Sequence, residues 1–513
     1  MLPQKKCVVI KIGSASTVAG FNNTELPLCI LSSSYMVDRA KEAAGTTNSS
    51  EKYIFGTTEM LEAALTSNTP SSLEVLTTVD DSGIPYNWTV IELQIRHIYA
   101  HYLHCDPTEF PLVITAPALK NEVANKVLEK YFALAFDKLH VPVAQVLIEP
   151  LATALAMGKS TALVVDMGAS GCNVTPVVDG TVVRAGAMRS RFAGNFLDYQ
   201  VAKTIEQKSA SASANEDTDI DMDAQSEATS LSAWMDAHTW IQDFKATMLQ
   251  VSDKELQEVE RFHRDQAEMY IKQQEQLQQF STNNPAATLD ETARDSIRQS
   301  NPLAQKHNFY YKNTHRHKLP QTLTFQLREC NAVVEHIFDP SALSDKYSRD
   351  DGLAEIMGKA VKKTGATVSA SGTNTLGSLG PSMKVQHQAS GNGASSALAN
   401  SASAPGGGSA GGSGASVAAG TTSSEQVYSN LLTNVIVTGA TSLIPGMEQR
   451  IINELSVRFP QYKITTFASQ VTLDRKIQGW TSSVAMANLP SWELAKWYTK
   501  EEFESELDAT NKE

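Results

Sequence analysis

The chain has 513 residues, and its 42% hydrophobic and 19% charged residues are ordinary for a globular protein. Its formal net charge of −13 argues against non-specific binding of nucleic acid, because neutralising phosphates needs clustered lysine and arginine. A chain of this length is expected to form two lobes, because single hydrophobic cores stop growing at about 250–300 residues.

Cysteine usage and the N-terminal residues indicate a cellular compartment. The five cysteines are scattered, with no CxxC pair and no metal-ligand spacing, so we predict reduced thiols and no metal site. The first residues, MLPQKK, lack a signal-peptide pattern, and no apolar run is long enough to cross a bilayer. These features favour a soluble intracellular protein without a membrane partner.

Two segments far apart in the chain have the same pattern. Residues 8–21 (VVIKIGSASTVAGF) and 163–180 (LVVDMGASGCNVTPVVDG) each contain an apolar β-run, a Gly/Ser/Ala turn and a second β-run. Such a hairpin directs backbone N–H groups toward one point, and two of them facing across a cleft would clamp a phosphate chain and its metal. The second segment has Asp166 at its strand end, whereas the first has Lys11 at the corresponding place. A cation at the position where metal binding needs an acid predicts a pair of hairpins that keeps the shape of a phosphate clamp but no longer supports its metal-dependent chemistry.

Buried strands and helices alternate along the first third of the chain, which predicts an α/β fold. The helix ATALAMG (152–158) is expected to end at Gly158, a plausible C-cap. The other predicted elements are strands at 7–12, 28–34, 52–55, 111–117 and 142–150, and helices at 90–103 and 120–139.

Three segments interrupt this pattern. Residues 207–230 are acidic and Ser-rich, which predicts a disordered insertion, and the Gly/Ser/Ala-rich residues 364–424 predict a flexible one. Residues 253–280 lack Gly and Pro and are rich in Gln and Glu, which predicts a projecting helix. Its thin apolar stripe leaves two interpretations open, a solvated helix or a helix that docks a partner.

The order of several short motifs resembles the actin family. These motifs are the first hairpin ending in AGF, GIPYNW (83–88), PLVITAP (111–117), VTGATSLIPGMEQR (437–450), DRKIQGW (474–480) and WYTKEEF (497–503). The similarity covers about residues 1–205, 232–252 and 428–505. Within the family, MGASGCNVTP, RKIQGW, MANLPSW and the Gln-rich helix resemble the nuclear actin-related proteins of fungal chromatin remodellers.

The resemblance implies the two-lobed α/β fold of actin, Hsp70 and sugar kinases. Lobe one would comprise residues 1–157 and 478–513. Lobe two would comprise residues 158–477 and would carry the insertions.

The resemblance also implies a nucleotide site between the lobes, but the chain departs from the family pattern there. In the first loop, Lys11 stands where the family has an acid, and Val18 stands where the family has a lysine that contacts the phosphates. In the second loop, Ala169 stands where the family has the next acid, and Asn173 stands where it has the His that orders the attacking water. Glu149 aligns with the Gln that positions this water. Glu149 could act as a base only with metal and water ligands in place. Lys11 could also neutralise phosphate directly in place of a metal.

Other positions match the family: Gly13, Ser14, Asp166, Gly168, Lys245, Gly439 and Lys476. Ala246 stands where the family has a Glu that binds the ribose, and Ala440 stands where the family has a second Gly. Each lost charge-assisted contact removes about 1.5–3 kcal/mol, so four or five losses would consume most of the roughly 12 kcal/mol of a nanomolar affinity. We therefore predict no required cofactor, weak or no ATP binding, and no hydrolysis. The alternative for the retained glycines is purely structural, as tight turns.

The family resemblance further implies an apolar groove at the base of the two lobes, in which a partner helix docks. The matching positions are Leu155, Gly158, Ser160, Met486, Leu489, Ser491 and Trp492. Trp492 and Trp497 are candidate anchors, because Trp buries a large area. The alternative for both tryptophans is an ordinary place in the core of lobe one.

Together these features imply a non-catalytic nuclear subunit of a SWI/SNF- or RSC-type remodelling complex. It would pair with a second actin-related protein and bind the helicase-SANT-associated helix of the remodeller ATPase, with a small accessory subunit and only indirect nucleosome contact. The alternatives are an actin-like ATPase, which Lys11 disfavours, and a cytoskeletal protein. The segment 35–60 disfavours the latter, because it shares none of the sequence of actin's polymerisation loop.

Overall fold

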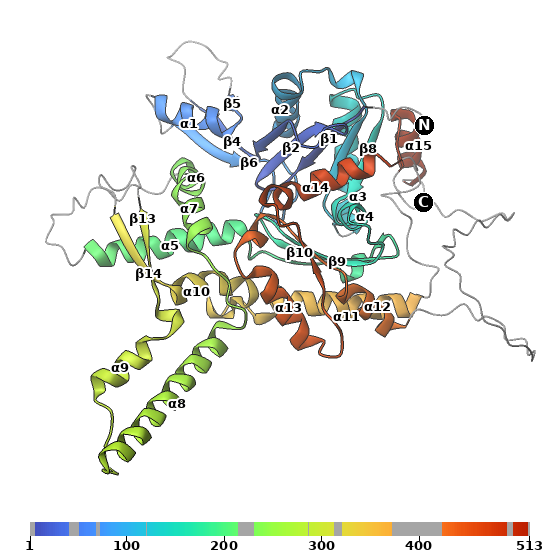
Figure 1. Ribbon diagram of the computed structural model, residues 1–513. Coiled ribbons are helices and arrows are strands. Elements are labelled where there is room, and N and C mark those ends of the chain that lie inside the picture. The colour runs from blue at the N-terminus through green and yellow to red at the C-terminus, as the bar shows by residue number, and fades with distance from the viewer. Residues whose placement is uncertain are drawn as a thin grey trace, which may run out of the picture.

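Two mixed β-sheets form the centres of two lobes in the computed structural model (Figure 1). The structure describes residues 6–39, 51–67, 72–119, 121–213, 230–285, 287–311, 321–371, 423–489 and 496–510. The sheet of lobe one has the order β3-β2-β1-β7-β8, with β1 Val8–Ile12, β2 Ser16–Phe21, β3 Cys29–Ser32, β7 Leu112–Ala116 and β8 Ala144–Ile148. The sheet of lobe two has the order β11-β10-β9-β15-β16, and β12 also pairs with β10. Its strands are β9 Ala162–Met167, β10 Cys172–Val178, β11 Thr181–Val182, β12 Met188–Ser190, β15 Val435–Thr438 and β16 Thr466–Phe467.

Each sheet contains one of the two predicted hairpins in the same setting. Strand β1 is antiparallel to β2 and parallel to β7, and β9 is antiparallel to β10 and parallel to β15. Parallel pairs need a crossover connection, which the intervening helices supply. The prediction of an α/β fold with two similar hairpins is confirmed.

Helices cover the sheet of lobe one. The N-terminus of the helix at 88–98 is capped by the side chain of Asn87, which accepts a hydrogen bond from the N–H of Val90. Gly158 follows the helix at 149–156 with a φ of +70°, the left-handed conformation expected after a helix end. The helices are α2 Trp88–Ile98, α3 Asn121–Ala133, α4 Glu149–Ala156, α14 Thr472–Ala487 and α15 Lys500–Thr510. Both α2 and α3 continue as π-helical turns, at Tyr99–Leu103 and Leu134–Lys138.

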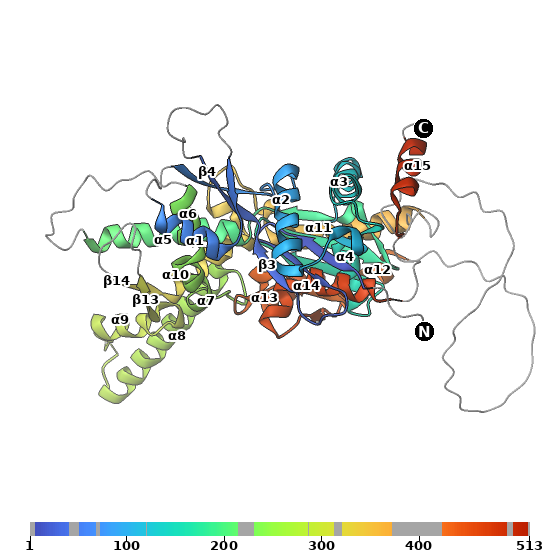
Figure 2. The same ribbon diagram turned by 90° about the horizontal axis from the view of Figure 1, so that it is seen from above.

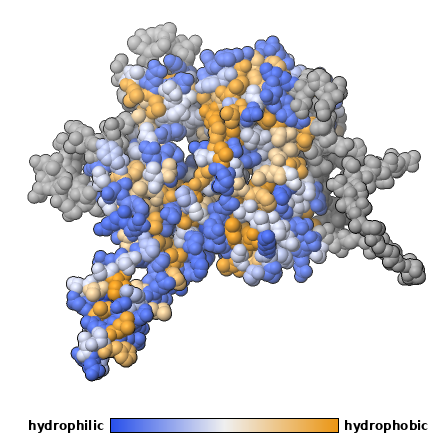
Figure 3. Space-filling model, in the orientation of Figure 1, coloured by the Kyte–Doolittle hydropathy of each residue, from blue (hydrophilic) through white to orange (hydrophobic). Residues whose placement is uncertain are grey.

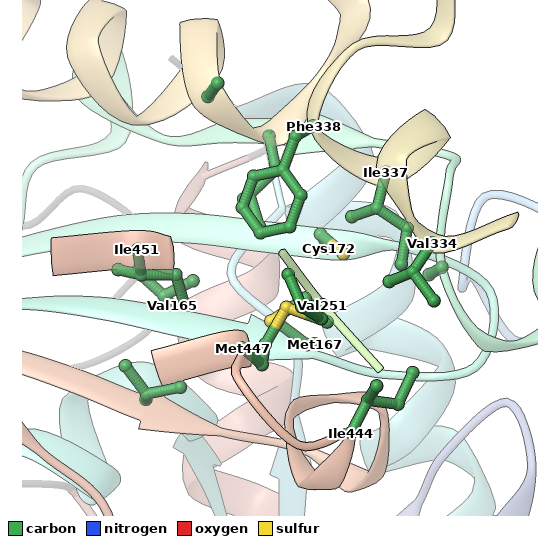
Figure 4. Close-up of a cluster of buried hydrophobic side chains, with 14 of the residues drawn as sticks. Val165, Met167, Cys172, Val251, Val334, Ile337, Phe338, Ile444, Met447 and Ile451 are labelled. Atoms are coloured by element: carbon green, nitrogen blue, oxygen red, sulfur yellow. The ribbon is translucent and has the colours of Figure 1, made fainter. Parts of the chain in front are cut away.

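The core of lobe two lies beneath the second hairpin. Figure 4 shows Phe338 and Ile337 above strands β9 and β10, with Met447 and Ile444 on the other side of the cluster. These side chains are at most 7% exposed, so the strand that ends in Asp166 has a rigid support. The contributing helices are α5 Gly194–Ser213, α7 Trp240–Thr247, α10 Leu327–Phe338, α11 Leu353–Ser371, α12 Ser424–Leu432 and α13 Met447–Arg458.

One buried guanidinium connects three parts of lobe two. Arg450 of α13 has a side chain that is 1% exposed, and it donates two hydrogen bonds to Glu335 of α10, at 2.9 and 2.6 Å. It also donates to Glu454 at 2.7 Å and to the carbonyl oxygen of Lys254 at 2.7 Å. A buried charge is tolerated when it is paired and hydrogen-bonded in this way, so Arg450 fixes the chain just before α8.

Of the smaller elements outside the two sheets, only the strand at 52–55 was predicted from the sequence, and it corresponds to β5. A three-stranded sheet, β4 Ser34–Asp38, β5 Lys52–Ile54 and β6 Leu73–Thr77, carries helix α1 Thr57–Thr66. A hairpin of β13 Lys306–Tyr311 and β14 Gln321–Gln326 lies in lobe two, as does helix α6 Ser230–His238.

Helix α6 packs on the three-stranded sheet of lobe one, so the lobes meet there through apolar side chains. The N–H of Val75 in β6 donates to the hydroxyl of Ser230 in α6 at 3.1 Å. We call the buried group at this contact the bridging cluster: Met36, Met60, Leu73 and Val75 from lobe one, with Leu231, Trp234 and Met235 from α6.

Helices α8 Leu256–Thr282 and α9 Glu291–Gln299 form an arm that extends away from lobe two (Figures 1 and 2). Helix α9 packs back on α8 where Ile271 is buried, and Arg298 donates to Glu268 at 3.1 Å. Apolar side chains are exposed elsewhere on α8, and the arm carries apolar patches among polar ones (Figure 3). They are Phe262, Met269, Tyr270, Leu277 and Phe280.

The predicted insertion boundaries were wrong at residues that fold as helix. Helix α5 continues to Ser213, and Ser209 is buried and donates to Gln321 at 2.8 Å. Helix α11 continues to Ser371, with Thr364 and Val368 buried. Tertiary packing overrides the composition signal at both places. The remaining residues of both insertions, 214–229 and 372–422, lie outside the described residues.

The predicted lobe boundary at 477/478 falls inside the continuous helix α14. This helix packs against β1, β2 and β7 of lobe one and against β15 of lobe two. Helix α4 likewise packs on β8 and on β9–β11. The two helices therefore cross between the lobes and pack against each other.

Within the described residues, three general features bear on function. All five cysteines are free, and four of them are buried. No described helix is long and apolar enough to cross a membrane. No group of three or more His, Cys, Asp or Glu side chains in this part of the chain could hold a metal ion.

Candidate functional site

The turns of the two hairpins face each other across the lobes. The hydroxyl oxygens of Ser14 in the first turn and Ser170 in the second are 2.6 Å apart. Each turn is also closed by its own backbone, since Gly13 N–H donates to Ser16 O and Gly168 N–H donates to Gly171 O, both at 3.0 Å. The two hydroxyls are therefore partners of one another, and they would have to separate to hold a phosphate between them.

Lys11 enters this cleft from β1 and pairs with a carboxylate. Its ammonium group donates to Glu149, which lies where β8 ends and α4 begins, and the two side chains are 18% and 17% exposed. Burial lowers the pKa of Lys11, but the charges of Glu149 and Asp166 raise it by more, so the ammonium form is held.

Gly479 of α14 packs directly on this ion pair. A Cβ atom at this position would lie 2.2 Å from Glu149 Oε1 and 2.6 Å from Lys11 Nζ. Real Cβ atoms do not approach other atoms so closely, so a side chain at this position would require the ends of Glu149 and Lys11 to shift. The sequence analysis did not single out this glycine.

Asp166 is the penultimate residue of strand β9, on the side of lobe two. Burial raises its pKa to about 6, and the negative charge of Glu149 adds to this shift. The charges of Lys11 and Arg189 and a hydrogen bond with Asn173 act in the opposite direction. Asp166 is thus the less well compensated of the two carboxylates near Lys11.

Arg189 of β12 connects the second turn to lobe one. It donates to the Ser170 carbonyl oxygen at 2.9 Å and to the Ser170 hydroxyl at 3.0 Å. It also donates to Asn173 Oδ1 at 3.0 Å and to the carbonyl oxygen of Asp81, in lobe one, at 3.1 Å. Sequence reasoning missed Arg189, because a lone arginine in a short strand has no motif.

Glycine is required beside Asp166 at the end of β15. Gly439 has a φ of +87°, and a Cβ atom there would lie 2.3 Å from the carbonyl oxygen of Met167 and 2.7 Å from Asp166 Oδ1. The hydroxyl of Thr441 donates to the carbonyl oxygen of Gly168 at 2.8 Å. The structure thus brings Asp166, Gly168 and Gly439 together, as expected for three parts of one cleft.

Lys245 and Lys476, the two lysines expected near the nucleotide base, have different surroundings. Lys245 of α7 donates to Asp198 of α5 at 2.6 Å, so its charge is paired within lobe two. Burial raises the pKa of Asp198, and the charge of Lys245 opposes this shift. Lys476 is exposed on α14.

The predicted partner-helix groove lies along the crossing helices. Leu155 and Met486 are half-buried, and Leu489 is 41% exposed. Gly158 and Ser160 are exposed, and a Cβ atom at Gly158 would meet nothing within 4 Å. Ser491 and Trp492 lie outside the described residues. Trp497 is partly buried against the cluster around Trp480, so it packs as a core residue and is not an exposed anchor.

Comparison with known proteins assigns the family. A family model described as Actin matches residues 3–507. The chain belongs to the actin family. It is 47% identical over 508 residues to Actin-related protein 7 of Saccharomyces cerevisiae, and this match covers 98% of the chain and 97% of that relative. The SWI/SNF and RSC complexes subunit arp42 of Schizosaccharomyces pombe is 29% identical over 194 residues, 38% of this chain and 42% of arp42. Actin-related protein 4 of Yarrowia lipolytica is 32% identical over 204 residues, 39% of this chain and 44% of that protein.

Family membership confirms the resemblance drawn from the motifs. It also means that the side chains in the cleft can be compared with those expected from the family pattern. This actin-family chain places one ammonium group and two carboxylates between its hairpin turns, with Lys11 paired to Glu149. The arrangement gives Glu149 a partner, so this carboxylate is not available as a base without breaking the ion pair.

Proposed function

We propose that this chain is a non-catalytic, actin-related subunit of a nuclear chromatin-remodelling complex of the SWI/SNF or RSC type. It would pair with a second actin-related protein, and together they would bind the helicase-SANT-associated helix of the remodeller ATPase. A small accessory subunit would stabilise the pair, and contact with the nucleosome would be indirect.

The ion pair between Lys11 and Glu149 is the main observation that supports a non-catalytic role. Hydrolysis needs a base and a metal held against the phosphates, and here the candidate base is bound to an ammonium group. Ser14 and Ser170 contact each other at 2.6 Å in the space between the turns. We therefore propose that no cofactor is required and that ATP binds weakly or not at all.

Two features support the partner part of the proposal. The similarity to Actin-related protein 7 covers nearly the whole chain, and the fission-yeast relative is named as a subunit of SWI/SNF and RSC complexes. The crossing helices leave Leu489 exposed and open space beside Gly158, as an apolar groove for a helix requires.

Co-purification tests this proposal. The chain is mixed with a helicase-SANT-associated peptide and a second actin-related protein, and bound nucleotide and ATP turnover are measured in the assembly. We expect a stable complex without turnover. Turnover that disappears in Asp166→Ala would favour the alternative, an actin-like ATPase.

Two surface variants test the groove itself. Leu489→Asp places a charge at an exposed apolar position, and Ser160→Trp adds bulk at an exposed one, so neither disturbs the core. Each should weaken peptide binding by about 2 kcal/mol, roughly 30-fold, as expected for a hot-spot change. Val457→Asp, at a 78% exposed position of α13, is the matched control. Unchanged peptide affinity in both groove variants would show that the helix docks elsewhere.

A further inference from the structure

The cleft holds charges from both lobes in one small space. Lys11 of β1 and Glu149 at the start of α4 belong to lobe one, and Asp166 at the end of β9 belongs to lobe two. Lys11 donates a hydrogen bond to Glu149 and interacts electrostatically with Asp166. The Lys11 ammonium group is therefore bonded to the carboxylate of lobe one, and its charge also acts, together with that of Arg189, on the carboxylate of lobe two.

Two carboxylates that approach each other in a cleft repel, and a cation between them removes the repulsion. A divalent ion such as Mg²⁺ is commonly held by one or two carboxylates with water completing its shell. An ammonium group is a compact charge with three donors, so it can place positive charge beside such carboxylates without a shell of water.

Helix α14 packs against the ammonium group at this place. The backbone of Gly479 lies so close that a Cβ atom would be 2.6 Å from Lys11 Nζ. Gly439 lies similarly close to Asp166, because a Cβ atom there would be 2.7 Å from Oδ1. A hydrated metal ion would need more room than a lysine side chain that is already 18% exposed and paired.

We propose that Lys11 is a built-in counter-ion that takes the place of a divalent metal ion between Glu149 and Asp166. Lys11 then supplies the positive charge that Mg²⁺ would otherwise bring to the cleft, and the relative position of the hairpin turns does not depend on a metal. This inference extends the proposed non-catalytic role, but it concerns the cleft alone and is tested without any partner.

Manganese binding tests the proposal on the full chain, with Mn²⁺ alone as the probe. Paramagnetic resonance counts bound Mn²⁺, and thermal unfolding reports its effect on stability. The unmodified chain should bind no Mn²⁺ at this position, and its Tm should be the same in EDTA and in Mn²⁺. Lys11→Gln leaves the two carboxylates facing each other, so it should gain one Mn²⁺ per chain. Its Tm should rise by about 1–3 °C when Mn²⁺ is about tenfold above Kd.

Three further variants separate the counter-ion from general effects of the substitution. Lys11→Arg keeps a cation and should bind no Mn²⁺. Lys245→Gln breaks an ion pair of similar exposure that has one carboxylate, Asp198, and it should gain no Mn²⁺. Combining Lys11→Gln with Glu149→Gln removes both charges of the pair, so this double variant should fold and lose the acquired Mn²⁺.

Two results would overturn the inference. The first is one Mn²⁺ bound by the unmodified chain and lost in Asp166→Asn, because the metal position would then exist beside Lys11. The second is a folded Lys11→Gln chain that binds no Mn²⁺. If Lys11→Gln does not fold, the unmodified chain, Lys11→Arg and the double variant still decide the question. Failure of the partner proposal would appear as absent peptide binding, which leaves these Mn²⁺ results unaffected.

Discussion

The bridging cluster should hold the two lobes together, and Leu231→Ala tests this. Leu231 is 7% exposed on α6 and packs in the cluster formed with β4, β6 and α1 of lobe one. Replacing a buried Leu by Ala costs about 2–5 kcal/mol, because apolar burial is lost and a cavity remains. Most of this cost should fall on the contact between lobes, since Leu231 lies at that contact.

Hydrogen exchange of single amides measures this loss where it occurs. The N–H of Val75 donates to Ser230 across the same contact, at 3.1 Å, so it is exposed to exchange when the lobes separate. A loss of about 2 kcal/mol corresponds to roughly 30-fold faster exchange of this amide. The amides of α6 should exchange faster as well, whereas those of β9, in the core of lobe two, should not.

Leu65→Ala is the matched control. Leu65 lies on α1 in the same part of lobe one but is 72% exposed, so its removal should change exchange by no more than about twofold. Equal exchange of the Val75 amide in Leu231→Ala and Leu65→Ala would refute the idea that the cluster joins the lobes.

Two further predictions concern the cleft. The pKa of Asp166 is raised to about 6, so the folded chain binds this proton more tightly than the unfolded chain, and stability falls as pH rises from about 4 to 6. Asp166→Asn should therefore raise the free energy of unfolding by up to about 3 kcal/mol at pH 7 and by little below pH 4, and a gain that does not vary with pH would contradict this. Gly439→Ala should cost more than Gly158→Ala in chemical denaturation. Both residues have positive φ, which costs about 1–2 kcal/mol for Ala, but the added Cβ atom at Gly439 would also lie 2.3 Å from Met167 O. Equal losses would mean that the backbone at Gly439 moves freely.

The parts of the fold that the sequence predicted are those with strong local patterns. Continuous apolar runs such as VVIKI and LVITA occur in central strands, and the turn residues between paired runs mark both hairpins. The helical end at Gly158 also follows from a local rule, because glycine adopts positive φ without strain.

The parts that were missed depend on contacts between distant residues. Strand β6 (LEVLT) is short and half polar, and its buried side is covered by α6, more than 150 residues later. Helix α5 passes through a Ser-rich segment because Ser209 is buried there. Strand β14 is different, because its alternation of Leu323 and Phe325 with polar residues was a readable pattern that was not used.

The candidate site also has features that the sequence predicted and features that depend on contacts between distant residues. The sequence identified Lys11 as an unusual cation between two phosphate-type turns, but its partner Glu149 lies 138 residues away and had been considered a base. Gly479, 468 positions after Lys11 in the chain, packs against the pair, and a side chain there would displace the ends of both groups. Residue types thus indicated that the cleft differs from its family, and only the packing shows which side chain compensates which charge.

The contacts between the lobes bear on the proposed scaffold role. The proposed groove along α4 and α14 would keep its shape only if the lobes keep their relative position, because both helices pack on both lobes. Among the described residues, the contacts that hold that position include the bridging cluster, the Ser14–Ser170 contact, the hydrogen bond from Arg189 to the Asp81 carbonyl oxygen and the electrostatic attraction between Lys11 and Asp166. A binding surface held by such internal contacts is preorganised, so it loses less conformational entropy when a partner helix binds. On the proposed function, the chain has replaced a ligand-dependent connection between its lobes by a permanent one, which suits a subunit whose task is to bind a helix.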